Sequence, residues 1–383
     1  MPWKETCKME QREQFIREAV KERIPFRHLC AQYGISHKTG YKWLQRFYES
    51  GWSGFKEESR RPGHSPKRLS EETVCDLIRL KGDHLSWGAK KILVIYSKRH
   101  PYNAPSLSSV NRIFKRAGLV KTRKKRYPKT GARMISNVEV AAPNDLWTMD
   151  FKGWWKTSEN TRFEPLTLRD DFSRYILLAE AMAENTESVK RALIKAFKQY
   201  GMPKVIQSDN GAPFAARSNI MGLSQLSAWL ISLGIHIHLS RPGKPQDNGG
   251  HERMHRDLKN EVQVRFRGDH KLYQAELDIW RDEFNTLRPH EALNMKTPSD
   301  LYVNSKRKYF DTETEIDYPN DFRIRKVNNT GCIKLFNEQY FITSALRGYQ
   351  LGLKTVDEEK LDVYFSDYIL GTINIDTMSF ATV

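Results

Sequence analysis

The sequence predicts a multidomain protein with all-α helix-turn-helix domains at the N-terminus, a central α/β domain with a mixed sheet, and a small C-terminal β-barrel. A chain of 383 residues is too long for one average domain. Helical periodicity dominates residues 11–120, whereas short apolar strands alternate with helices between residues 143 and 303. Residues 304–383 are rich in short strands separated by turn signals.

The positive charge of the chain is concentrated in its first third. The net charge is +17 at pH 7. Residues 1–140 contain 31 Lys and Arg against 13 Asp and Glu, a net of +18, and residues 141–383 contain 32 against 33, a net of −1. Solubility does not require this asymmetry, but a polyanionic partner bound by the N-terminal third does. A basic ribosome-associated or chaperone-like segment is the alternative interpretation.

Several classes of protein are excluded by the composition. No apolar run approaches the roughly 20 residues of a membrane helix, and the charged N-terminus lacks the apolar stretch of a signal peptide. The four cysteines are far apart and form no C-x-x-C pair, which argues against a disulfide framework or a cysteine zinc site. We therefore expect a cytoplasmic protein without membrane contact.

The first helix-turn-helix domain is predicted over residues 1–50. Helices are expected at 14–22, 26–33 and 37–48, with Gly34 allowing a tight turn and Ser36 capping the third helix. Gly40 weakens this third helix by about 1 kcal/mol relative to Ala. The alternative is an ordinary three-helix core with a solvated basic face. If the third helix reads DNA, the residues that contact it are His37, Lys38, Lys42, Gln45 and Arg46.

A second helix-turn-helix or winged-helix domain is predicted over residues 70–120, after a Gly- and Pro-rich linker at 51–69. Arg112 and Lys115 lie on the outward face of its last expected helix. A basic linker follows at residues 121–142, and its positive run cannot pack into a core. It is either a solvated connection or a segment that follows a DNA groove through Arg123, Lys124, Lys125 and Arg126.

Three acidic residues stand where strands and helices of the 143–303 domain are expected to meet. Asp150 lies within an apolar strand, Asp209 ends a second strand, and Glu252 lies in the first turns of a helix. A buried lone Asp is costly unless it is paired or bound to a metal. Three carboxylates suit Mg²⁺ rather than zinc, because two divalent ions held near each other need negative ligands around them.

Cations surround the third acid in the sequence. Arg256 and Lys259 follow Glu252 at helical spacing and share its face, so a metal ligand and two phosphate-binding cations point the same way. Arg253 either contacts DNA or holds Glu252 by an ion pair. Asp247 is the main competitor of Glu252 for the role of third acid.

Four blocks of sequence resemble the integrase-core, or DDE, transposases of bacterial insertion sequences. The first three are Trp147-Thr-Met-Asp150-Phe, Ser208-Asp-Asn-Gly211 and Pro245-Gln-Asp-Asn-Gly-Gly-His-Glu252-Arg, and the fourth runs from Asn285 to Pro298. The similarity extends over residues 11–303. It favours Glu252 over Asp247, because Asn248-Gly249 precedes Glu252 at the family offset.

The resemblance implies a ribonuclease-H-like catalytic domain with Asp150, Asp209 and Glu252 as catalytic residues and as the ligands of Mg²⁺, which Mn²⁺ can replace. It also implies a transposase that cuts transposon-end DNA by hydrolysis and joins the 3′-OH ends to target DNA. The partners implied are double-stranded DNA and further copies of the chain, which form at least a dimer. The location implied is the cytoplasm, in association with the nucleoid. The spacing from Asp209 to Glu252 exceeds that of retroviral integrases, and we place the surplus at residues 215–233.

Three other functions compete with this interpretation. His251-Glu-Arg-Met-His255 matches the H-E-x-x-H pattern of zinc proteases, although surface contacts with phosphate or backbone also explain the two histidines. His238-Leu-Ser-Arg241 with Tyr273 echoes tyrosine recombinases, which need an all-helical context. A DNA-binding regulator built on an inactive transposase core is the third. The nearly neutral β domain at residues 304–383 suits protein contact or core capping as well as DNA binding.

Overall fold

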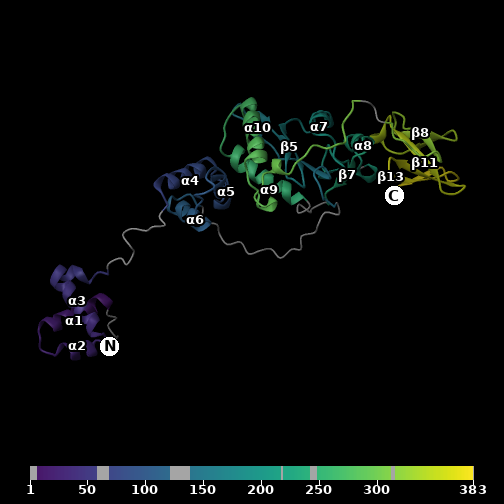
Figure 1. The fold of residues 1–383 in the computed structure, drawn as a ribbon. Coiled ribbons are helices and arrows are strands. Elements are labelled where there is room, and N and C mark those ends of the chain that lie inside the picture. The colour runs from purple at the N-terminus through teal and green to yellow at the C-terminus, as the bar shows by residue number, and fades with distance from the viewer. Residues whose placement is uncertain are drawn as a thin grey trace. The chain divides into compact units, whose positions relative to one another are not determined.

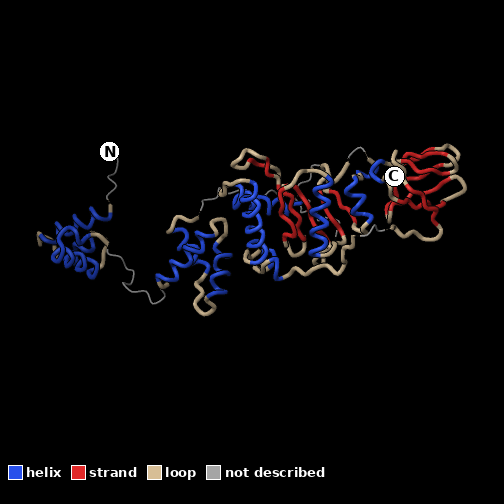
Figure 2. The backbone as a smooth tube through the Cα atoms, turned by 90° about the horizontal axis from the view of Figure 1, so that it is seen from above, coloured by secondary structure: helices blue, strands red, loops and turns tan. Residues whose placement is uncertain are grey.

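The computed structural model describes residues 7–57, 69–120, 139–216, 219–241, 248–311 and 315–382. The chain divides into two compact units, Met1–Leu69 and Ser70–Val383. Helices and strands are traced in Figures 1 and 2. Within the described ranges, every helix is too short or too polar to cross a membrane.

The N-terminal unit contains the three helices that the sequence predicts. They are α1 (Lys8–Val20), α2 (Phe26–Gln32) and α3 (His37–Ser50), followed by a short turn of helix η1 (Gly51–Phe55). Helix α1 begins earlier than expected because Cys7 acts as its cap and accepts a hydrogen bond from the backbone N–H of Glu10. Ser36 caps α3 as predicted.

Gly40 lies at the closest approach of α3 to the rest of this unit. A Cβ atom built on Gly40 would lie 2.7 Å from the Cys30 Sγ and 3.0 Å from the Phe26 ring. Gly40 is buried, and α3 packs on a core that includes Phe15 and Cys30. The glycine that weakens the helix locally therefore lets two helices pack tightly.

The second helical region opens the larger unit with α4 (Glu71–Asp83), α5 (Ala89–Arg99) and α6 (Leu107–Arg116). Ser70 and Ser106 accept hydrogen bonds from the first turns of α4 and α6, as expected of N-caps. Leu77, Trp87 and Phe114 belong to their shared core. Residues 69–120 contain no strand, so a wing is not seen within that range.

The central domain is built on a mixed five-stranded sheet in the order β5-β4-β1-β6-β7. β1 pairs in parallel with β6 and antiparallel with β4, as a central α/β domain with a mixed sheet requires. The strands are β1 (Leu146–Phe151), β4 (Pro165–Asp170), β5 (Ile176–Ala181), β6 (Val205–Ser208) and β7 (His236–Leu239), and a small hairpin joins β2 (Trp155–Lys156) to β3 (Arg162–Phe163).

Helices cover both faces of this sheet. One face packs on α7 (Thr186–Tyr200) and α8 (Gln225–Ser232) through a core that contains Trp147 and Phe197. On the other side, α9 (Gly249–Leu258), the π-helical turn η4 (Lys259–Gln263) and α10 (His270–Thr286) share a second core with Ile176. Asn185 caps α7, because its side chain accepts a hydrogen bond from the backbone N–H of Ser188. The remaining short helical turns are η2 (Ile220–Gly222), η5 (Glu291–Leu293), η6 (Pro298–Asp300) and η7 (Ser344–Leu346).

The C-terminal region forms an antiparallel sheet in the order β14-β13-β12-β11-β8, with a separate β9–β10 hairpin packed on the same core. The strands are β8 (Phe322–Lys326), β9 (Cys332–Leu335), β10 (Glu338–Phe341), β11 (Gln350–Thr355), β12 (Lys360–Phe365), β13 (Tyr368–Asn374) and β14 (Ser379–Thr382). The sequence predicts a small closed barrel here. The structure does not show one, because β14 and β8 stand at opposite ends of the strand order. The surplus segment at 215–233 supplies Leu223, Ala228 and Ile231 to this core.

We predict that Gly40→Ala destabilises the N-terminal unit by about 1–3 kcal/mol, although Ala is the better helix former, because the added methyl group meets Cys30 and Phe26. Hydrogen exchange of the α1–α3 amides in the full chain measures the change. Gly82→Ala in α4 is the control, since nothing lies within 4 Å of a Cβ atom there, and it should not speed exchange in α4–α6. Unchanged exchange in Gly40→Ala would contradict the packing argument.

Candidate active site

Parallel pairing of β1 and β6 brings Asp150 and Asp209 to the same edge of the central sheet. Thr148 lies opposite Gln207 in this register, so Asp150 and Asp209 are each two residues farther along neighbouring strands. Side chains alternate along a strand, which places Asp150 on the same face of β1 as Thr148. Asp209 follows the end of β6 and accepts a hydrogen bond of 3.1 Å from the backbone N–H of Gly211.

Glu252 joins these two acids from the first turns of α9. Burial, followed by the negative charge of Asp209 and more weakly that of Glu252, raises the pKa of Asp150 to about 7, while the Lys152 ammonium opposes the shift. Asp209 and Glu252 are therefore both within electrostatic reach of Asp150. Within the described ranges, no three His, Cys, Asp or Glu side chains are gathered closely enough to enclose a metal ion.

Thr167 on β4 is the centre of a buried hydrogen-bond network beneath this edge. Its Oγ1 lies 3.0 Å from the Asp150 carbonyl oxygen, 2.6 Å from His251 Nε2 and 2.7 Å from His255 Nε2. A hydroxyl group donates once and accepts twice, so Thr167 donates to Asp150 and accepts from both rings. Thr148 Oγ1 lies 2.9 Å from His251 Nδ1 and donates to it in this arrangement. The network ties α9, which carries Glu252, to the strand that carries Asp150.

The two histidines are neutral members of this network. Burial, aided by neighbouring positive charges, lowers the pKa of His255 to about 3 and that of His251 well below its ordinary value. His255 Nδ1 lies 3.7 Å from Asp150 Oδ2. The prediction of surface contacts for these histidines is wrong, because the alternation of β1 and β4 places threonines beneath α9. The same contacts leave no free pair of imidazoles for the H-E-x-x-H zinc site.

A buried arginine explains Gly250 at the start of α9. The side chain of Arg169 is 3% exposed and pairs with Asp171. A Cβ atom on Gly250 would lie 2.5 Å from the Arg169 guanidinium. Only a glycine lets the backbone of α9 approach this side chain so closely.

Arg288 anchors the other end of the same helical segment. This side chain is 5% exposed and forms ion pairs of 2.7 Å with Asp257 and 2.8 Å with Glu261. Asp257 lies on α9 and Glu261 on η4, so the pairs fix the segment that follows Glu252. These ion pairs give Arg288 a supporting role behind Glu252. His290 in the same block is half-buried, and its partial burial lowers its pKa to about 3.

Cations line the approach to the three acids. Arg253, Arg256 and Lys259 are exposed on α9 and η4, and the ion pair expected between Arg253 and Glu252 is absent from the described residues. Lys152, to which the sequence pattern gave no role, also lies near these groups. Burial, followed by the charge of Lys259, lowers its pKa, and the charge of Asp150 opposes the shift. Its spacing two residues after Asp150 on a strand was the available signal.

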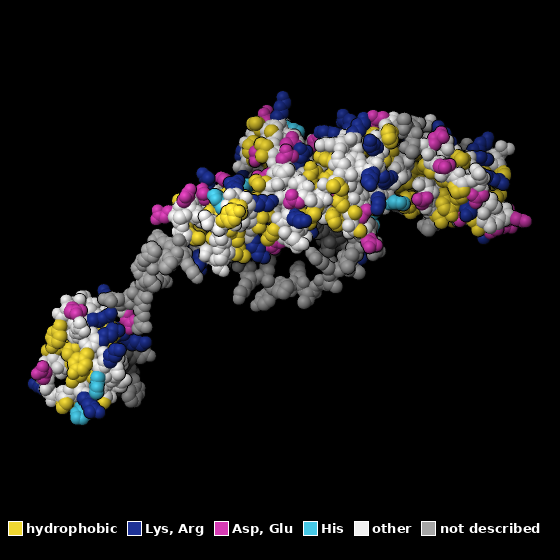
Figure 3. All heavy atoms as spheres, in the orientation of Figure 1, with side chains coloured by type: hydrophobic (Ala, Val, Ile, Leu, Met, Phe, Trp, Pro, Cys, Tyr) yellow, Lys and Arg dark blue, Asp and Glu magenta, His cyan; other side chains and the backbone are white. Residues whose placement is uncertain are grey.

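The DNA contacts predicted for the helical regions are mostly on the surface. Exposed positions on α3 and α6 hold His37, Lys38, Lys42, Gln45, Arg112 and Lys115, whereas Arg46 is half-buried. Figure 3 shows Lys and Arg side chains gathered on part of the N-terminal unit. Outside the described residues lie Asp247, Arg123, Lys124, Lys125 and Arg126.

The tyrosine-recombinase alternative does not fit the fold. Tyr273 is fully buried, and its hydroxyl donates a 2.9 Å hydrogen bond to the carbonyl oxygen of Phe266. His238 lies on β7 of a sheet rather than in a helical bundle. Tyr273 is therefore a core residue, not an accessible nucleophile.

Comparison with known proteins identifies the central domain. Residues 140–245 and 233–298 match two models described as integrase core domain, and residues 7–81 match the leucine-zipper of insertion element IS481. The described part of that last segment forms short helices separated by turns or by an undescribed stretch.

Two curated relatives come from insertion elements of bacteria. The uncharacterized 31.7 kDa protein of IS407 from Burkholderia multivorans is 26% identical over 244 residues, which cover 62% of this chain and 82% of the relative. The uncharacterized 39.2 kDa protein of IS476 from Xanthomonas euvesicatoria is 28% identical over 265 residues, 66% of this chain and 70% of the relative.

Among solved structures, the HTLV-2 integrase catalytic core domain in complex with magnesium is 17% identical, with a TM-score of 0.33, and covers 42% of this chain and 97% of that chain. From these matches, residues 140–298 form an integrase core domain, and the chain is a homologue of proteins encoded by bacterial insertion elements.

Proposed function

We propose that this chain is a metal-dependent DDE transposase. It binds double-stranded DNA at transposon ends, cuts it by phosphodiester hydrolysis and joins the 3′-OH ends to target DNA by strand transfer. The observation that carries the proposal is that Asp150 and Asp209 lie at the same ends of the paired strands β1 and β6, and that the charges of Asp209 and Glu252 both act on Asp150. A family match alone would not distinguish an active enzyme from an inactive relative.

The donor set fits Mg²⁺, with Mn²⁺ as a substitute. Asp150, Asp209 and Glu252 offer only carboxylate oxygens, which hard divalent cations prefer, and the nearby histidines are occupied by threonine hydroxyls. The repulsion that raises the pKa of Asp150 is the repulsion that a bound cation would relieve. When bound, the metal supplies activation of the attacking oxygen and stabilisation of the leaving oxygen.

The protein's own residues hold the nucleic acid against this edge. Lys152, Arg256 and Lys259 lie beside the acids, so they bind and orient the phosphates on either side of the bond to be cut. The network centred on Thr167 keeps Glu252 and Asp150 in place before DNA arrives. Joining two transposon ends requires more than one such site, and we therefore propose a dimer or larger assembly on DNA.

Recognition of the ends is assigned to the helical regions. Ser36 and Gly34 set α3 in a helix-turn-helix arrangement, with its exposed face carrying Lys42. Beneath this face, the Trp43 ring is approached by Arg12 at 3.9 Å, Lys42 at 4.8 Å and Arg46 at 5.3 Å. The aromatic ring keeps several cations close together on a small surface, which suits phosphate binding.

The first experiment tests catalysis. In the proposed mechanism, Asp150→Asn removes a metal ligand and should lower Mg²⁺-dependent cutting of end-containing DNA by about a thousandfold or more. Asp376→Asn is the matched control, because Asp376 is exposed in the C-terminal sheet region, and it should cut like the wild type. If wild-type protein binds end DNA tightly without cutting it, the chain is a DNA-binding regulator on an inactive core.

Metal binding should depend on pH through Asp150. The pKa of about 7 means that this carboxyl is protonated below pH 7 and must lose the proton to act as a ligand. Mn²⁺ affinity measured by calorimetry should therefore rise about tenfold per pH unit below pH 7 and level off above it, as expected when one proton is displaced. The Asp150→Asn protein should lack this slope, and a flat wild-type profile between pH 5 and pH 7 would refute the assignment.

DNA binding by α3 should depend on salt. Lys42→Ala should weaken binding of end DNA and reduce the slope of log K against log salt by about one, as for the loss of one phosphate contact. Lys21→Ala, which removes an exposed lysine just after α1, is the control and should leave the slope unchanged. Equal slopes for Lys42→Ala and the wild type would remove α3 from the DNA interface.

A further inference from the structure

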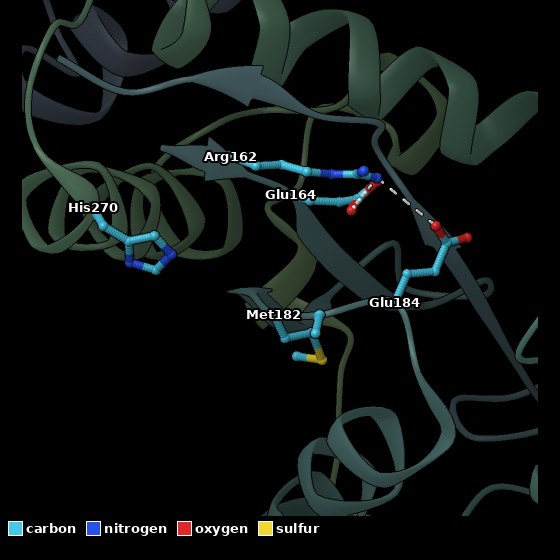
Figure 4. A pocket seen from close by; sticks show the side chains of 6 residues that line it. Arg162, Glu164, Met182, Glu184 and His270 are labelled. Carbon is cyan, nitrogen blue, oxygen red and sulfur yellow. Dashed lines mark ion pairs between the residues drawn. The ribbon is translucent and has the colours of Figure 1, made fainter. Parts of the chain in front are cut away.

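A cavity of about 540 Å³ opens beside the catalytic edge. It is lined by residues from β3, the β5–α7 connection and the start of α10, namely Arg162, Glu164, Met182, Ala183, Glu184 and His270. Figure 4 shows Arg162 against Glu164, with Glu184 beyond them and His270 and Met182 on other walls. This volume lies within the roughly 300–1,000 Å³ of small-ligand pockets.

The cavity lining lies beside the segment that follows Asp150, because the backbone N–H of Lys152 donates a 3.0 Å hydrogen bond to the carbonyl oxygen of Pro165, the neighbour of Glu164. Burial and the charge of Glu164 raise the pKa of Glu184, Arg162 opposes the shift, and the charge of Asp209 adds to it. Asp209 is therefore within electrostatic reach of Glu184. A strand held at the catalytic edge would place a neighbouring nucleotide near the mouth of the cavity.

The charges in the cavity select a base rather than a phosphate. Arg162 forms an ion pair of 2.6 Å with Glu164, whose side chain is 8% exposed, and lies 4.0 Å from Glu184. Two carboxylates against one guanidinium leave the lining negative when His270 is neutral, which repels phosphate. Carboxylates accept hydrogen bonds and a guanidinium donates them, so the lining can pair with the polar edge of a base.

An exposed indole stands at the edge of this lining. Trp154 is 53% exposed, and the Arg162 guanidinium lies 5.4 Å from the centre of its ring. Exposed aromatic rings beside cations are platforms on which unpaired bases stack. Trp154 follows Asp150 by four residues and lies in the loop just after β1, the strand that carries Asp150.

We propose that this cavity receives one unstacked guanine from the DNA strand next to the bond that is cut, with Trp154 as its stacking platform. This inference rests on the proposed transposase function. Guanine presents one acceptor, O6, beside two donors, the N1–H and the amino group. Arg162 donates to O6, and a glutamate carboxylate accepts from the two donors. Thymine presents a single donor between two acceptors and fits this lining poorly.

The test uses duplexes that are identical except for one unpaired 3′ nucleotide, with the full chain and with Ca²⁺ replacing Mg²⁺ to slow cutting. Fluorescence anisotropy should give about tenfold tighter binding for a guanine tail than for a thymine tail. Glu164→Gln should reduce this preference to about twofold or less, whereas Glu338→Gln on exposed β10 should preserve it. Thermal unfolding identifies any variant that fails to fold.

Trp154 has a separate measurement. Trp154→Ala should weaken binding of all four tails about tenfold, and Trp154→Phe should restore most of the loss, because stacking tolerates any base and needs only an aromatic ring. Light-induced cross-linking of a 6-thioguanine tail, mapped by mass spectrometry, should label Trp154, Met182 or His270. This readout does not depend on the affinity of the variants.

The outcomes separate the two proposals. Wild-type protein that cuts end DNA but binds the four tails within twofold of one another, or cross-links outside the cavity, overturns the base site and leaves the transposase intact. Wild-type protein that neither binds nor cuts any of the DNA overturns the proposed function, and the base site with it.

Discussion

Mutual repulsion of three carboxylates is the constraint around which the central domain is arranged. Asp150 is largely removed from water and lies near two other acids, and burial followed by their charges raises its pKa to about 7. The fold must supply the free energy that keeps these groups together without a cation. It does so with rigid neighbours: the β1–β6 register fixes Asp150 and Asp209, and buried contacts of Thr167 and Arg169 fix the start of α9.

Much of this arrangement could be predicted from local sequence. Alternation along β1, the turn after Asp209 and helical spacing around Glu252 are local properties, and they placed all three acids on the correct elements. The surface position considered for His251 and His255 was wrong, because a polar side chain on a helix is usually expected to face solvent and both of these are buried. Their threonine partners lie 84–103 residues away along the chain, beyond any local pattern.

The roles of two glycines in helices also could not be predicted from local sequence. Helix propensity treats Gly40 as a defect in α3, and Gly249-Gly250 as an unfavourable start for α9. In the structure, Gly40 admits the side chains of Cys30 and Phe26, and Gly250 admits the guanidinium of Arg169. Gly40 and Gly250 are each explained by a neighbour from another element, so their roles depend on tertiary packing, whereas a Cβ atom on Gly249 would meet nothing within 4 Å. The cavity beside Trp154 likewise combines three separate segments.

The packing of Arg288 connects two regions that the sequence treats as separate domains. Its guanidinium pairs with Asp257 and Glu261 behind Glu252 and lies 5.8 Å from the centre of the Trp87 ring, between α4 and α5. Ser86 donates a hydrogen bond to the same Glu261. One buried ion-pair network thus holds both α9 and the second helical region. A buried ion pair is costly to break, so this connection is rigid. If α6 binds DNA, the connection would hold that DNA at a fixed position relative to the three acids.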